Sequence, residues 1–184
     1  FKQKTAYEIM PSLVGSEMCI RDRFDTVEGV TNVQSGYAGG HLRNPTYEQV
    51  CSGVTGHAEV VQMVFDPSVI AYRELLEIFF CIHDPTTLNR QGADVGSHYR
   101  SAIYTHSNEQ IEVAQTMIDE VSARGQWNGA IVTEIQPLEI FFPANAYHKD
   151  YYQRNSAQPY CRIVIQPKLS GFRERFRHLV KVVT

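Results

Sequence analysis

Apolar and polar positions alternate along most of the chain in patterns that predict strands and helices. Strands are predicted at 31–37, 57–65, 101–106 and 130–136. Helices are predicted around 75–82, from the capping pair Ser107 and Gln110 to about Ala123, over 146–154 and over 169–181. This mixture favours an α+β fold in which helices pack on a sheet.

The predicted strand at 57–65 differs from the others because it has almost no polar face. A strand of this kind is covered on both sides, so we expect it near the centre of the sheet. The helix that follows carries the apolar stripe Leu75, Leu76, Phe79, Phe80 and Ile82. The next helix is expected to bury Ile111, Ala114, Ile118 and Val121.

The first 23 residues, FKQKTAYEIMPSLVGSEMCIRDR, show neither strand alternation nor a sustained helical face, and they begin with Phe rather than Met. They resemble a translated sequencing adapter of the kind found at the ends of fragmentary environmental sequences. We therefore expect a foreign segment at 1–23 and a single domain over 24–184.

Composition narrows the classes of function. With 43% hydrophobic residues among 184, the chain can bury one core. The net charge of −3, without a basic stripe, argues against nucleic acid as a partner. The sequence has neither an apolar run of about 20 residues nor a secretory signal, which favours a soluble, cytoplasmic protein.

The four cysteines are widely spaced and form no CxxC pair. This spacing indicates neither a disulfide framework nor a thiolate zinc site. Cys51 and Cys81 are predicted to be small core residues.

Polar groups of chemical interest gather in and beside two long loops, at 39–56 and 84–100. Tyr47 lies in the first loop, and Glu59 begins a buried strand, where desolvation raises the pKa of a carboxyl. Asp94 and Tyr99 lie in the second loop. Together they can protonate an oxygen that leaves a substrate, but they need a separate nucleophile. A solvated Glu59 at a strand end and an Asx turn at Asp94 remain open alternatives.

A metal site is a further alternative. His57, His83, His98 and His148, with Glu59 and Asp84, supply suitable ligand types. Their spacing fits no common metal motif, so surface or structural histidines are the prediction. A metal hydrolase remains an alternative.

Three blocks, GYAGGHLRNPTYEQVCSGVTGHAEVVQMVFDP, FFCIHDPTTLNRQGADVGSHYRSAIY and FFPANAYHKDYYQRN, closely resemble A-type peptide methionine sulfoxide reductases. The resemblance runs from about Phe24 to the C-terminal helix. It implies repair of oxidised proteins and of free methionine S-sulfoxide by thiol chemistry, without a cofactor. We expect a two-layer α/β sandwich with a ferredoxin-like central sheet, acting as a monomer.

The resemblance also implies a role for each loop residue. Glu59 corresponds to the proton donor, Tyr47 and Tyr99 to the hydroxyls that bind the sulfoxide oxygen, and Asp94 to a carboxylate that organises the site. Cys161 corresponds to the resolving thiol, whose attack on a sulfenic acid gives a disulfide that thioredoxin reduces. A plain buried cysteine remains the alternative for Cys161.

The family's nucleophile lies in a Gly-Cys-Phe-Trp motif at the start of a helix, which this chain lacks. Counting back without gaps from Val27 places the motif on residues 15–18, with Ser16 where the cysteine belongs. Cys19 is a nearby thiol. We therefore expect the chain as written to be inactive or nearly so, or to be a catalytically dead module that binds methionine sulfoxide.

Overall fold

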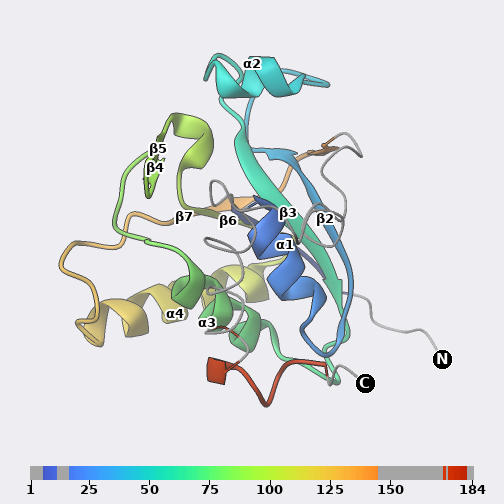
Figure 1. Cartoon of the computed structure of the whole chain (residues 1–184), viewed down its shortest axis with the longest axis vertical. Coiled ribbons are helices and arrows are strands. Elements are labelled where there is room, and N and C mark those ends of the chain that lie inside the picture. The colour runs from blue at the N-terminus through green and yellow to red at the C-terminus, as the bar shows by residue number, and fades with distance from the viewer. Residues whose placement is uncertain (1–5, 12–16, 145–171, 173, 182–184) are drawn as a thin grey trace, which may run out of the picture.

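The computed structural model describes residues 6–11, 17–144, 172 and 174–181 (Figure 1). Its elements are β1 (Ala6–Pro11), α1 (Glu17–Asp25), β2 (Val30–Ala38), α2 (Tyr47–Cys51), β3 (Ala58–Phe65), α3 (Tyr72–Ile82), β4 (Arg90–Gln91), β5 (Asp94–Val95), the 3-10 turn η1 (Ser97–Tyr99), β6 (Ala102–Thr105), α4 (Asn108–Ala123), β7 (Glu134–Pro137) and β8 (Phe141–Pro143). The fold is therefore a mixed α/β fold, as predicted.

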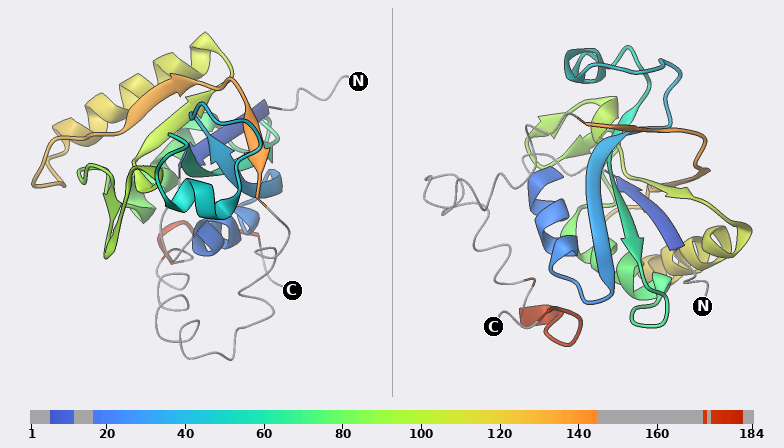
Figure 2. Two further views of the ribbon diagram at one scale, coloured as in Figure 1. Left: turned by 90° about the horizontal axis from the view of Figure 1, so that it is seen from above. Right: turned by 90° about the vertical axis from the view of Figure 1, so that its right-hand side faces the viewer.

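A six-stranded sheet, in the order β7-β6-β1-β3-β2-β8, forms the centre of the molecule (Figures 1 and 2). β3 pairs antiparallel with β1 on one side and with β2 on the other. β7 is the exception to the antiparallel pattern, because it runs parallel to β6. The central position predicted for the apolar strand at 57–65 is thus confirmed.

The two faces of β3 contribute to two different clusters. Val61, Met63 and Phe65 face a core that also contains buried residues from α1, α3 and α4. Ala58 and Val60 face the other way, in a smaller cluster with Tyr104. Side chains alternate along a strand, so the face to which Glu59 belongs is the one that α1, α3 and α4 cover.

The buried stripe of α4 differs from the prediction. Ala114 and Val121 are buried as expected, but Met117 is the third buried residue, whereas Ile111 and Ile118 are only half buried. The i, i+3, i+7 spacing of the buried three keeps them on one line toward the core, and the two isoleucines flank it.

The N-terminal segment contains elements that the sequence pattern did not predict. β1 lies inside the sheet between β6 and β3, and α1 begins at Glu17. Pro11 is the last residue of β1 rather than its middle, so its missing N–H does not interrupt the ladder. The pairing that β3 and β6 offer outweighs the weak alternation of the segment.

Two predicted elements are shorter than expected. The predicted strand at 130–136 is regular only from Glu134 onward. The predicted helix at 169–181 gives way to a turn at 176–179, after which Val180 bridges to Val27. Backbone bonds from Glu28 to Leu179 and from Lys181 to Thr26 hold this end extended. The predicted helix at 146–154 lies outside the described residues.

Candidate active site

Glu59 lies at the end of β3 toward which the N-terminus of α1 points. β1 ends opposite Val60, and β2 begins opposite Phe65. Since α1 connects these two strands, it runs from the Glu59 end of β3 toward the Phe65 end. The Glu59 side chain is only 5% exposed. A buried carboxyl therefore lies near the positive end of a helix dipole.

The first loop contains the short helix α2, which carries Tyr47 and Cys51 one turn apart. A capping box starts it: the Thr46 hydroxyl accepts from Gln49 N, and the Gln49 side chain accepts from Thr46 N. The Tyr47 hydroxyl donates to Cys51 Sγ, and this bond raises the pKa of Tyr47. Burial, together with the nearby charge of Glu59, raises the pKa of the Cys51 thiol. Both groups are therefore protonated near neutrality.

The second loop presents His98 and Tyr99 from η1, with their rings 3.7 Å apart between centroids. Gly96 has φ +156°, and a Cβ there would lie 2.5 Å from the His98 ring, so a side chain at this position would displace the imidazole. Burial lowers the pKa of His98, an effect that the charge of Asp94 opposes. Among the described residues, nothing hydrogen-bonds the buried Nδ1 of His98.

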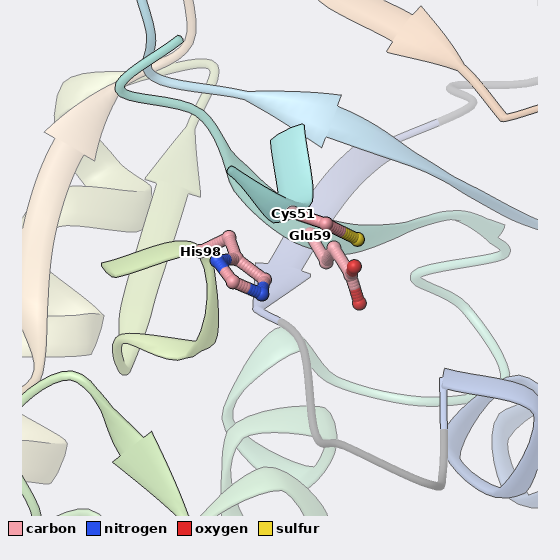
Figure 3. Close-up of side chains that lie close together, drawn as sticks. All are labelled: Cys51, Glu59 and His98. Atoms are coloured by element: carbon pink, nitrogen blue, oxygen red, sulfur yellow. The ribbon is translucent and has the colours of Figure 1, made fainter. Parts of the chain in front are cut away.

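These elements converge on one point (Figure 3). Cys51 Sγ, a carboxylate oxygen of Glu59 and a ring nitrogen of His98 all lie within 4.8 Å of one another. Tyr47 is close enough to Glu59 and Tyr99 for their charges to raise its pKa as well. The structure thus brings together three of the predicted site residues, namely Tyr47, Glu59 and Tyr99.

The other predicted residues are placed differently. Asp94 is half buried on β5 and acts electrostatically on His98. Cys161 and Ser16 lie outside the described residues. Cys19 lies in the first turn of α1.

Cys51 belongs to this cluster although sequence reasoning made it a core residue, and His98 was considered only among scattered histidines for a metal site. The prediction of core positions for Cys51 and Cys81 is wrong, because Cys51 is half exposed and Cys81 is exposed. α2 stands on a loop and buries only Val50, and Cys81 faces away from the core on α3. The Thr46–Gln49 capping box was the sequence signal for α2, and it would have placed Cys51 one turn after Tyr47.

Two other histidines have structural roles, as predicted. His57 Nδ1 accepts from Gly40 N at 3.0 Å, which leaves Nε2–H to donate to Leu42 O at 2.7 Å. His83 Nδ1–H donates to Phe79 O at 2.6 Å, so Nε2 accepts from the Ser101 hydroxyl at 2.8 Å. Burial lowers the pKa of His83 to about 4. Neither ring has a nitrogen free for a metal.

The side chain of Asp84 also has a structural role, because it accepts hydrogen bonds from Thr86. Its Oδ1 accepts from the backbone N–H and the hydroxyl of Thr86 at 2.9 and 2.6 Å, as in an Asx turn. The fourth histidine considered, His148, lies outside the described residues. The metal hydrolase alternative therefore loses His57, His83 and Asp84 as ligands.

Arg100 connects the two loops behind the site. Its guanidinium donates to Ser97 O at 3.0 Å, to Gly56 O at 3.1 Å and to the Tyr104 hydroxyl at 2.9 Å, and it pairs with Glu134 at 3.4 Å. The same arginine lines a pocket of about 370 Å³ that also touches Tyr104 and Glu134. Arg100 thus fixes η1 relative to the start of β3.

Comparison with known proteins defines the class of this chain. The sequence model of the family described as peptide methionine sulfoxide reductase matches residues 14–180. The chain is therefore an oxidoreductase by class. It belongs to the peptide methionine sulfoxide reductase family, which confirms the resemblance seen in the sequence and the predicted activity, reduction of methionine sulfoxide.

Individual relatives agree with this assignment. A peptide methionine sulfoxide reductase MsrA of Saccharolobus solfataricus is 52% identical over 168 residues, which are 91% of this chain and 94% of the relative. Reduced Mxr1 from Saccharomyces cerevisiae superposes with a TM-score of 0.76 at 32% identity and covers 88% of this chain and 91% of its own. Mxr1 in complex with Trx2 has a TM-score of 0.56 at 26% identity, with coverages of 80% and 86%.

None of the helices in the described part of the chain has the length and apolar character that crossing a bilayer requires.

Proposed function

We propose that methionine S-sulfoxide, free or in proteins, is reduced at the cluster around Glu59, with Glu59 as the proton donor. The observation that carries this proposal is the burial of Glu59 beside Tyr47 and Tyr99, at the end of β3 from which α1 starts. Burial favours the protonated form of a carboxyl, which is the form that a general acid requires.

The reaction needs each of these groups in a defined state. A thiolate attacks the sulfoxide sulfur, Glu59 protonates the sulfoxide oxygen, and the S–O bond to the substrate breaks as the oxygen passes to the enzyme sulfur. The products are methionine and a sulfenic acid. The hydroxyls of Tyr47 and Tyr99 donate to the sulfoxide oxygen, and the raised pKa of Tyr47 keeps its proton available. Asp94 positions the loop through its interaction with His98.

The place for the nucleophile is position 16, directly before α1. A thiol at a helix N-terminus has a lowered pKa, and the N-terminus of this helix is at the Glu59 end of β3. The chain carries Ser16 there, and a serine hydroxyl without a base is not a nucleophile near neutrality. We propose that residues 1–23 are foreign to a domain over 24–184 and that the chain as written is nearly inactive, although the family match begins at residue 14.

Turnover requires a second thiol and a reductant. We assign the resolving role to Cys161, whose disulfide with the nucleophile a thioredoxin then reduces. The solved complex of Mxr1 with Trx2 supports a partner of this kind. We further propose that the protein is a monomer and that it works in the cytoplasm, where the reducing environment keeps such dithiols reduced.

The sheet order supports the finer description of the fold. The strands β6-β1-β3-β2, connected through α1 and α3, follow the order and antiparallel pairing of a ferredoxin-like sheet. The shared core of α1, α3 and α4 on one face supports a two-layer α/β sandwich.

One comparison tests the proposed function. The chain as written is compared with a restored variant that carries Ser16→Cys, Glu17→Phe and Met18→Trp, using dithiothreitol as reductant and methionine formation as the measurement. The restored variant should be faster by at least about 10³-fold. If the restored variant binds methionine sulfoxide without reducing it, the scaffold is a binding module and the proposed function fails.

A further inference from the structure

The cluster around Glu59 contains two groups that the proposed reduction does not use. Cys51 comes from the end of α2 and His98 from η1, whereas Glu59 begins β3. Their donor atoms lie within 4.8 Å of one another (Figure 3). A thiol, an imidazole and a carboxyl are the three donor types that proteins use to bind zinc.

The geometry is close to that of a tetrahedral site. Zinc lies about 2.0–2.3 Å from such ligands, which places the ligand atoms roughly 3.5 Å apart. The separations here, at most 4.8 Å, are within a side-chain rotation of that value. Two of the three ligands come from elements that Arg100 connects, because it bonds Ser97 of η1 and Gly56 just before β3. His98 and Glu59 are therefore held in fixed positions relative to each other.

His98 gives a second, independent indication. Its side chain is 5% exposed, it points into the cluster, and nothing among the described residues hydrogen-bonds its Nδ1. The ring lies so close to Gly96 that a Cβ there would come within 2.5 Å of it.

A bound divalent ion would displace the proton of the Cys51 thiol and that of the Glu59 carboxyl, and its charge would neutralise the thiolate and carboxylate that result. The Tyr47 hydroxyl, which donates to Cys51 Sγ, supplies the outer hydrogen bond that metal ligands usually have. Cys51 is half exposed, which gives the ion a route from solvent.

We propose that Cys51, Glu59 and His98 bind one thiophilic divalent cation, with Zn²⁺ as the ion that fits them best and a fourth position open to water. Binding does not depend on the proposed function. A consequence that does rest on it is reversible inhibition, because a bound ion would occupy the Glu59 oxygens and prevent proton donation.

Metal alone is the probe for the test. The full chain, reduced and stripped of metal, is titrated with Zn²⁺ in competition with a chromophoric chelator. We expect one ion per chain, and Cys51→Ser and His98→Gln should each weaken binding by at least about 100-fold. Cys81→Ser is the matched control: it removes an exposed thiol on α3, outside the cluster, and should change nothing.

Binding of Co²⁺ in place of Zn²⁺ tests the proposal on the unmodified chain, so the result does not depend on whether a variant folds. The unmodified chain should show a thiolate-to-cobalt charge-transfer band, and a spectrum without it would overturn the proposal. So would the absence of Zn²⁺ binding at micromolar concentration, or full binding in both Cys51→Ser and His98→Gln. If Zn²⁺ binds as expected while the restored variant reduces no sulfoxide, only the proposed function fails.

Discussion

Two buried histidines at either end of the second loop, His83 and His98, have opposite surroundings. Burial lowers the pKa of both rings. Around His83 every donor has an acceptor, because Thr133 bonds Ser101, Ser101 bonds the ring, and the ring bonds Phe79 O. The Nδ1 atom of His98, by contrast, has no hydrogen-bond partner among the described residues, and the side chains of Cys51 and Glu59 lie within 4.8 Å of the ring.

The difference shows how a buried polar group with a structural role is distinguished from one with a chemical role. Burial is common to both histidines and therefore decides nothing. A satisfied network stabilises the fold, since removing one member leaves another buried and unpaired. A buried ring nitrogen that no described group hydrogen-bonds is instead a place where a ligand can bind. Changes around His83 should therefore alter stability, and changes around Glu59 should alter chemistry.

The largest effect is expected on the rate of sulfoxide reduction when Glu59 is replaced. In the restored variant, Glu59→Gln keeps the shape of the side chain but removes its proton, so the rate of sulfoxide reduction should fall about 10²–10⁴-fold. Single-turnover methionine formation measures the rate, and substrate affinity should change much less. Equal rates in the two proteins would remove Glu59 from the mechanism.

The second prediction concerns His83 and pH. The folded state holds this ring neutral down to about pH 4, whereas an unfolded ring is protonated below about 6.5. The unfolded state therefore binds more protons as pH falls from 6.5 to 4, and stability is lost in that window. His83→Gln should lose about 3 kcal/mol less between pH 7 and 4, as measured by urea unfolding. Identical pH profiles would contradict the assignment.

The third prediction concerns Arg100, which bonds Ser97 in the second loop and Gly56 in the first. Replacing Arg100 should therefore destabilise both loops. Arg100→Lys retains the charge but cannot make all the bonds of the guanidinium, and the free energy of unfolding should fall by about 2 kcal/mol. Glu134→Gln, which alters only the more exposed partner, should cost less than about 1 kcal/mol. If denaturant melts show a larger loss of unfolding free energy for Glu134→Gln than for Arg100→Lys, Arg100 does not connect the loops.

The smallest effect is expected on the rate of sulfoxide reduction when the hydroxyl of Tyr47 or Tyr99 is removed. Since Tyr47 and Tyr99 share the sulfoxide oxygen, removing one hydroxyl should slow the restored variant by about tenfold. Tyr47→Phe and Tyr99→Phe are compared in the same single-turnover assay, and stability should be unchanged for the exposed Tyr47. A rate unaffected by both substitutions together would refute their role.

The sequence predicted the elements with strong periodicity and missed those that depend on partners. β2, β3, α3 and α4 carry clear apolar patterns, and the structure confirms them. β1 has a weak pattern and forms because β3 and β6 pair with it. Local patterns do not contain such long-range pairing.

The same distinction applies to the site. Glu59, Tyr47 and Tyr99 were predictable because their loops carry recognisable motifs. The meeting of Cys51 with His98 was not predictable, although His98 was among the histidines considered for a metal, because it depends on the position of α2 and on the backbone of Gly96 at φ +156°. Residue type alone favours a core cysteine and a structural histidine.

The most direct test of the central claim is to locate the oxidised sulfur after one turnover. The restored variant is mixed with methionine sulfoxide without reductant, trapped with a reagent specific for sulfenic acids, and mapped by peptide mass spectrometry. We predict one methionine per chain and oxidation at the thiol introduced at position 16, either as the trapped sulfenic acid or in a disulfide. Oxidation that begins at Cys51 or Cys19 with position 16 left reduced would contradict the account.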